Sequence, residues 1–358
     1  MAKLLSDAPD FSAPPGEGGG RSRQNAAGFT LVELMVAVTI TVIILGLLLQ
    51  VLGFASSNWQ KVNDNTKAFE GARASFDSIT RQLSQTTLGT YYEYYDSNHV
   101  PYPLATNADA QVSTVGTNAA KGFFPSVYGR FSYLHFITGT NLVPWQTTYS
   151  MFFQAPLDFE GKGTTESTSG QLNAVGYFVQ YTNDVAGRPS HLASGSPAPR
   201  NRYRLMQYFQ PTQNLMVYSA ADRSWITNAA SLARPFAENV VCLVLWPKKT
   251  DEEGGVTTTN LIAPHYTYDS RMTNWASGAA QPVQMHQLPP TVRVLMVAVD
   301  ETSASRLAGP GEFTDGLFAE PASYPADLAE LEKRLRKGRL NYRIFQSDVP
   351  LRAAKWSE

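Results

Sequence analysis

An uncharged, mostly apolar run from Leu34 to Ala55 limits what this chain can fold into more than any other feature. As a helix, these residues rise about 33 Å at about 1.5 Å each, which matches a membrane hydrocarbon core about 30 Å thick. Thr39, Thr41 and Gln50 are its strongly polar members. Because a hydroxyl can bond to the carbonyl four residues earlier in a helix, they do not prevent insertion. We therefore expect residues 29–55, which include this run, to form the membrane-spanning half of an N-terminal helix.

Basic residues predict the orientation of this segment. Arg21 and Arg23 precede it, and the first charged residue after Glu33 is Lys61. Since basic residues are retained on the cytoplasmic side of membranes, the N-terminus is expected there. The bulk of the chain is then expected to be exported.

Glu33 is a single carboxylate at the start of the apolar run, where an unpaired charge is costly. Cleavage after Gly28, the nearest small-residue site, would create an amine on Phe29, four residues from Glu33. An ordinary secretory signal has its cleavage site after the apolar core instead. A cut after Gly28 would keep the span and discard residues 1–28, a leader too polar and too rich in proline and glycine to fold.

Beyond the span, the pattern predicts that the helix continues as an amphipathic half over residues 56–90. No proline interrupts the chain between Phe29 and Val100, so one helix could run to about Leu88. The alternative is two helices broken near 53–57. The apolar positions recur at helical spacing and are Trp59, Val62, Phe69, Ala72, Phe76, Ile79 and Leu83.

Residues 91–358 have the composition of a β-rich globular head. Aromatic, glycine, proline and β-branched residues increase, and a short helix is predicted at 325–337, where Gly338 would end it. The fold class is therefore α+β, with a long N-terminal helix packed on this head. The predicted strands are 131–137, 149–154, 174–181, 203–209, 214–218, 240–246, 292–299 and 340–345.

Composition gives no positive reason to propose catalysis, a metal, a cofactor or nucleic-acid binding. The net charge is −1, and no basic stripe interleaved with aromatic residues is present. Cys242 is the single cysteine and is expected to be a small buried hydrophobe. Five scattered histidines lack metal-ligand spacing, and His135 is expected to face a sheet. The acidic cluster 251–253 is expected to be a solvated loop rather than a calcium site.

A tyrosine cluster follows the predicted helix and has two interpretations. Packing of the helix on the head is favoured, since tyrosine rings bury large area while their hydroxyls stay wet. A partner surface is the alternative, because tyrosine is enriched at interfaces. The cluster consists of Tyr91, Tyr92, Tyr94, Tyr95 and Tyr102.

The segment from Gly28 to Ala37, GFTLVELMVA, resembles the N-terminal methylation motif of type IV pilins and type II secretion pseudopilins. More loosely, the head is similar to the J-type minor pseudopilin at 237–240 and 288–294. The segment Tyr342–Arg352, YRIFQSDVPLR, resembles more closely the pilin-like family called Verru_Chthon cassette protein C.

This resemblance implies that a prepilin peptidase cleaves between Gly28 and Phe29 and methylates the Phe29 amine. Glu33 would then pair with the N-terminal amine of a neighbouring subunit, while Leu31 and Leu34 join the apolar helix packing. The implied partners are the peptidase, other pilin or pseudopilin subunits, an inner-membrane assembly platform and the lipid bilayer. The implied location is the bacterial inner membrane, with a cytoplasmic N-terminus and a periplasmic head, before extraction into a filament.

The expected function is that of a non-enzymatic minor pseudopilin in a type II secretion or type IV pilus-like envelope filament. Two alternatives from other classes remain open. One is a minor pilin that acts as an adhesin or ligand-capturing tip subunit. The other is a single-pass envelope enzyme, which would need a cleft with convergent polar groups.

Overall fold

The structure is a computed structural model that describes residues 30–95, 99, 101, 127–157, 170–183, 185, 200–218, 223–250, 261–272, 274–276, 279–307 and 309–356. The chain forms two compact units, Met1–Trp59 and Gln60–Glu358. The predicted helix is present as α1 (Leu31–Ser84), which contributes to both units. It is helical through 53–57, so the alternative of a break there is wrong, and it ends at Ser84 rather than Leu88.

The part of α1 within the second unit buries one face. Phe69, Ala72, Phe76, Ile79 and Leu83 are all buried, at the helical spacing that the sequence predicts. Trp59 and Val62, which precede them in the predicted stripe, are 77% and 62% exposed. The amphipathic face is therefore confirmed from Phe69 onward, and its first two predicted members are not covered.

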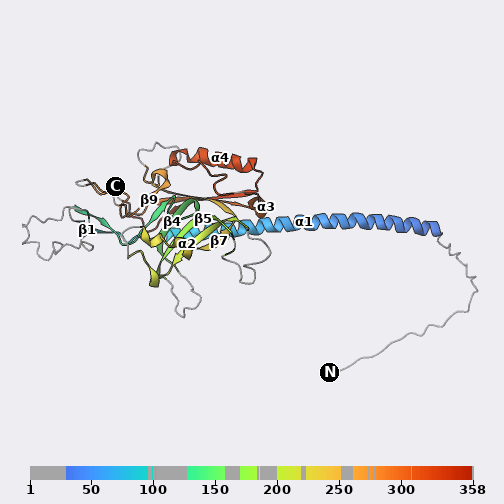
Figure 1. Cartoon of the computed structure of the whole chain (residues 1–358), viewed down its shortest axis with the longest axis horizontal. Helices are drawn as coiled ribbons and strands as arrows, with labels where there is room; N and C mark the ends of the chain where they lie inside the picture. The colour runs from blue at the N-terminus through green and yellow to red at the C-terminus, as the bar shows by residue number, and fades with distance from the viewer. Residues whose placement is uncertain are drawn as a thin grey trace, which may run out of the picture. The chain divides into compact units, whose positions relative to one another are not determined.

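Two antiparallel sheets face one another and form the main core of the second unit (Figure 1). The larger sheet has the order β7-β6-β5-β4-β3-β9, and the smaller has the order β11-β10-β8. Strand β8 lies against β4, β5 and β6, which places the apolar core between the sheets. The bounds are β3 (Ile137–Gly139), β4 (Gln146–Pro156), β5 (Leu172–Thr182), β6 (Arg202–Gln210), β7 (Arg234–Glu238), β8 (Val240–Lys248), β9 (Tyr268–Asp269), β10 (Thr291–Val299) and β11 (Tyr342–Pro350).

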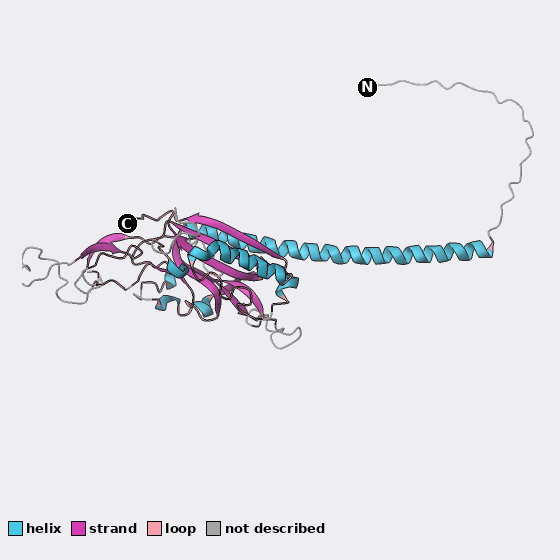
Figure 2. Ribbon diagram, turned by 90° about the horizontal axis from the view of Figure 1, so that it is seen from above, coloured by secondary structure: helices cyan, strands magenta, loops and turns pink. Residues whose placement is uncertain are grey.

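Side-chain alternation on β11 separates the two faces of the small sheet. The ring of Phe345 lies 5.7 Å from the ring of Phe76 on α1. The next residue, Gln346, accepts a 2.8 Å hydrogen bond from the hydroxyl of Tyr324 at the start of α4 (Tyr324–Lys337). Because successive side chains of a strand point to opposite faces, α1 and α4 cover opposite sides of the sheet (Figure 2).

The short helix α4 confirms the prediction for 325–337. Leu331 and Leu335 are buried, and Glu330 accepts an i, i+4 contact from Arg334 at 3.5 Å. Gly338 takes the C-cap position, as the sequence indicates.

A two-stranded antiparallel ribbon, β1 (Tyr91–Tyr95) with β2 (Val127–Phe131), stands apart from both sheets. It has its own small core cluster of Tyr95, Phe131, Trp275 and Met285. Two further short helices complete the described elements, α2 (Ala229–Leu232) and α3 (Glu301–Ala304).

Two predicted strands are wrong in part or in full. In the predicted strand 131–137, Phe131 ends β2 and Ile137 begins β3, while the residues between them are irregular. In place of the predicted strand 214–218, the chain makes a 3₁₀ turn at Thr212–Asn214 and then turns again. The other six predicted strands overlap observed ones, namely β4, β5, β6, β8, β10 and β11.

Candidate functional site

A capping box begins helix α1. The side-chain oxygen of Thr30 accepts the backbone N–H of Glu33 at 3.3 Å. The Glu33 carboxylate reaches back and accepts the backbone N–H of Thr30 at 3.0 Å and its hydroxyl at 2.9 Å. Each side chain thus satisfies a backbone N–H that the first helical turn leaves unpaired. The Thr30-x-x-Glu33 spacing is the sequence signal for this cap, which the interpretation of Glu33 as an intermolecular partner overlooked.

The apolar part of α1 has the length and composition of a membrane span. The candidate span is Leu31–Trp59, and all of its residues are exposed. Leu31 and Leu34, the predicted packing residues, are 76% and 60% exposed. The hydroxyls of Thr39 and Thr41 donate to carbonyls four residues earlier, at 2.8 and 2.7 Å, as expected. Gly28 and Phe29 lie outside the described residues.

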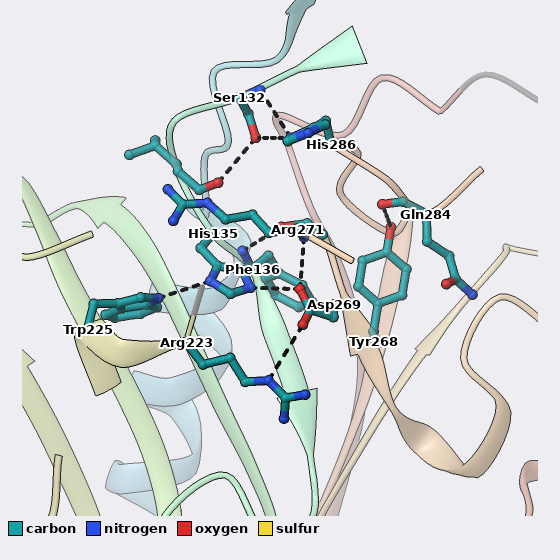
Figure 3. A network of polar contacts seen from close by, with 12 residues as sticks. Ser132, His135, Phe136, Arg223, Trp225, Tyr268, Asp269, Arg271, Gln284 and His286 are labelled. Atoms are coloured by element: carbon teal, nitrogen blue, oxygen red, sulfur yellow. Dashed lines mark hydrogen bonds and ion pairs between the residues drawn. The ribbon is translucent and has the colours of Figure 1, made fainter. Parts of the chain in front are cut away.

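In the head, a buried histidine joins three segments that are distant in sequence (Figure 3). The indole N–H of Trp225 donates to Nδ1 of His135 at 2.9 Å. Since Nδ1 accepts, Nε2 carries the proton and donates to the Asp269 carboxylate at 2.8 Å. Asp269 also accepts the backbone N–H of Arg271 at 2.8 Å. His135 lies between β2 and β3 rather than on the predicted strand.

The protonation states of this pair follow from burial and hydrogen bonding. Burial lowers the pKa of His135, against the opposing effect of the Asp269 carboxylate. Burial acts to raise the pKa of Asp269, but the bond from His135 and the N–H of Arg271 outweigh it and leave that pKa below its ordinary value. A neutral imidazole therefore donates to an ionised carboxylate.

A second buried histidine, His286, holds the β2 end of the same region (Figure 3). Its Nδ1 accepts the backbone N–H of Ser132 at 3.1 Å. The Ser132 hydroxyl lies 3.1 Å from both this nitrogen and the carbonyl oxygen of Leu134. Burial lowers the pKa of His286 to about 3. These bonds tie the chain after β2 to the segment before β10.

The histidines of this region bond to other parts of the fold. Both nitrogens of His135 are occupied, and no third group among the described residues is seen to orient His286 against Ser132 as in a catalytic triad. Cys242 is fully buried on β8, and burial raises its pKa to about 12, which makes it inert. Among the described residues, no three His, Cys, Asp or Glu side chains gather as metal ligands. The acidic cluster 251–253 lies outside the described residues.

The tyrosine cluster is divided between a core and a surface. Tyr95 is buried in the small cluster under the ribbon, where its ring lies 5.1 Å from that of Trp275. Tyr92 and Tyr94 are 54% and 45% exposed and pack around the exposed Tyr128 of β2. The favoured interpretation, packing of α1 on the head, is therefore wrong for the described tyrosines, which belong to the ribbon. Tyr102 lies outside the described residues.

A cavity of about 480 Å³ opens beside the ribbon, with Tyr92 in its wall. Arg130, Lys355 and Trp356 also line it, and the sequence analysis did not single out any of these three. No local pattern could have found them, because they come together from β2 and the chain end after β11.

Comparison with known proteins identifies the N-terminus alone. Residues 23–49 match the family described as the prokaryotic N-terminal methylation motif. No curated protein and no solved structure matches the chain. The motif supports a type IV pilin-like protein, and with the apolar helix it fits membrane anchoring.

Proposed function

We propose that this chain is a minor pseudopilin or pilin-like structural subunit, non-enzymatic, of a type II secretion or type IV pilus-like envelope filament. The observation that carries the proposal is the methylation motif at 23–49, which overlaps the exposed apolar helix Leu31–Trp59. A helix that exposes apolar side chains all round is stable only when lipid or other helices surround it. In a subunit that moves from the bilayer into a helical bundle, lipid surrounds this helix first and other helices surround it afterwards.

Processing supplies the charge that assembly needs. A prepilin peptidase would cut between Gly28 and Phe29 and methylate the Phe29 amine, which remains cationic. The Glu33 carboxylate of a neighbouring subunit would pair with it. Since a carboxylate has about four acceptor positions, Glu33 can receive this amine while it keeps the bonds to Thr30. Leu31 and Leu34, both exposed, would pack against neighbouring helices.

The remaining assignments follow from the same proposal. The chain would sit in the bacterial inner membrane with its N-terminus in the cytoplasm and its head in the periplasm, and an assembly platform would extract it. The similarity to J-type pseudopilins and to the Verru_Chthon cassette protein C family involves 237–240, 288–294 and 342–352. In the structure these segments form the junction of β7 with β8, the approach to β10, and β11.

N-terminal sequencing of the protein extracted from membranes tests this proposal. In cells that contain a prepilin peptidase, the mature chain is expected to begin at N-methylated Phe29. In a strain that lacks the peptidase, the chain is expected to keep residues 1–28. A mature protein that still begins at Met1 in the presence of the peptidase would overturn the proposal.

A further inference from the structure

The charged residues that line the cavity beside the ribbon, among those the structure describes, are both cations. They are Arg130 and Lys355. The guanidinium of Arg130 is held in place by the carbonyls of Pro282, Val283 and Met285, at 3.0, 3.4 and 3.3 Å. Lys355 is exposed on the chain that follows β11. A ligand that carries a negative charge therefore suits this cavity.

Aromatic rings give the same site a flat apolar wall. Tyr92 lines the cavity and stacks on Tyr128, with ring centroids 5.4 Å apart and planes at 22°. The ring of Tyr94 lies 4.9 Å from that of Tyr128, and neither of these two rings lines the cavity itself. All three rings are exposed, although a stacked aromatic platform is normally buried or covered by a ligand.

Polar groups complete the cavity. Thr87 and the buried Gln287 line it, and both carry hydrogen-bonding side chains. Trp356 lines it as well, and among the described residues its buried indole N–H meets no acceptor. A volume of about 480 Å³ lies within the range of about 300–1,000 Å³ that is typical of small-molecule sites.

We propose that this cavity binds a carboxylate-bearing sugar residue of an acidic polysaccharide. A pyranose ring has an apolar C–H face that can stack on Tyr92, and hydroxyls that can bond to groups such as Thr87 and Gln287. The carboxylate would lie near Arg130 and Lys355, where charge-assisted bonds are the strongest available. This activity goes beyond that of a structural subunit and depends only on the head.

Single-stranded nucleic acid also combines stacking with negative charge, but the site suits it less. Nucleic-acid channels follow the backbone with a row of basic residues, whereas the described lining of this cavity has two, and the chain has a net charge of −1. A compact cavity fits one or two sugar units better than a strand that must pass through. Nucleic acid is therefore an outcome of the test and not the proposal.

Calorimetric titration of the full chain in detergent micelles tests this site. The probe is an oligogalacturonate, and its control is the methyl-esterified form of the same oligosaccharide, which has the ring but not the charge. We expect the ester to bind at least tenfold more weakly. Equal binding of the two, or no binding of either at millimolar concentration, would overturn the proposal.

Variants assign the binding to this cavity. Lys355→Ala and Tyr92→Ala are each expected to weaken oligogalacturonate binding at least fivefold, whereas Tyr92→Phe retains it. Lys337→Ala, which removes an exposed lysine at the end of α4, is the matched control and should leave binding unchanged. The proposal fails if Lys355→Ala and Lys337→Ala behave alike, or if oligothymidylate binds more tightly than oligogalacturonate and depends on Lys355.

Discussion

Arg293 and Asp348 lie directly opposite each other on β10 and β11 and form a two-point ion pair. Nε of the arginine lies 2.6 Å from Oδ1 of the aspartate, and Nη2 lies 2.7 Å from Oδ2. The same carboxylate accepts the ammonium of Lys248, which is 2% exposed, at 3.0 Å. One carboxylate thus balances a cation on each of the other two strands of the small sheet.

Asp348→Asn is expected to destabilise the head because it removes the carboxylate that the buried Lys248 and Arg293 share. Removing one member of a fully buried pair costs about 3–5 kcal/mol, and the 37% exposure of the Asp348 side chain reduces this to about 1–3 kcal/mol. Urea denaturation of the full chain in detergent measures the change. Asp77→Asn, which breaks an exposed pair with Arg73, is the control and should cost less than about 1 kcal/mol. Equal losses in the two variants would contradict this interpretation.

Trp225→Phe is expected to remove the N–H that His135 accepts and to leave part of the buried indole volume empty. A buried acceptor without a donor costs about 1–3 kcal/mol and the lost packing adds to it, so the free energy of unfolding should fall by at least about that amount. Circular dichroism during urea denaturation measures it without relying on tryptophan fluorescence. Trp145→Phe, at a position 70% exposed, serves as the control. A loss no greater than that of the control would show that the bond does not stabilise the fold.

The stability of the head is expected to fall as the pH decreases from about 6.5 towards 3. Burial lowers the pKa of His286 to about 3, whereas an unfolded histidine has a pKa of about 6.5. Between these two pH values His286 is protonated in the unfolded chain but not in the folded one. Each unit of pH decrease therefore lowers the free energy of unfolding by up to about 1.4 kcal/mol. The effect of this histidine on the free energy of unfolding is therefore absent above about pH 6.5 and grows as the pH falls towards 3. Burial lowers the pKa of His135 as well, which adds in the same direction.

His286→Asn is expected to reduce this pH dependence, because asparagine does not titrate. Denaturation midpoints at pH 4, 5, 6 and 7 for the variant and the wild type give the two slopes. An unchanged slope would mean that another group takes up the proton.

Gly176→Ala is expected to destabilise the core, because the new Cβ would lie 2.1 Å from Cδ1 of Phe152, whose ring is fully buried. Overpacking of this kind costs about 1–3 kcal/mol. Gly71→Ala on α1 is the contrasting variant, since no atom beyond its chain neighbours and the nearby helix backbone lies within 4 Å of the new Cβ. It should be neutral or stabilise by up to about 1 kcal/mol, because alanine favours a helix. Thermal unfolding of both variants distinguishes the two effects.

Glu33→Gln is expected to keep membrane insertion but lose co-assembly with partner subunits. The amide can still accept the N–H of Thr30, so the cap persists, whereas the charge that would attract a neighbouring amine is gone. Crosslinking in membranes measures co-assembly, and Glu70→Gln, an exposed glutamate further along α1, is the control. Crosslinking as efficient as in the control would count against the pairing role.

The parts of the fold that depend on local pattern could be predicted from the sequence. The buried face of α1 follows from helical spacing, and β8 and β10 follow from runs of β-branched and apolar residues. The helix α4 has its apolar stripe and a glycine stop. The local sequence of each of these elements predicts it without knowledge of the segments that pack against it.

The irregular segment between β2 and β3 shows why other parts could not. Its alternation of aromatic residues predicts a strand, but its backbone N–H groups bond to side chains from distant segments. His135 donates to Oε1 of Gln154 at 2.8 Å, and Phe136 donates to Oγ of Ser270 at 2.9 Å. Side-chain acceptors thus replace a neighbouring strand, and no local pattern reveals partners that are distant in sequence.

The cavity and its cations were missed for a similar reason. Lys355 and Trp356 follow β11 and belong to no sequence motif. They can be recognised as part of a site only because the fold places them beside Tyr92 and Arg130. Predicting them would have required the strand order of the whole head.

The separate core of the β1–β2 ribbon sets this part of the head apart from the two larger sheets. Four buried side chains and the bonds from Arg130 to 282–285 hold it, and in the part of the chain that the structure describes neither of its strands pairs with those sheets. Sequence changes on the exposed face of the ribbon can therefore accumulate while the pairing within both larger sheets is kept. Related chains could differ in what this face touches and still keep the same apolar N-terminal helix.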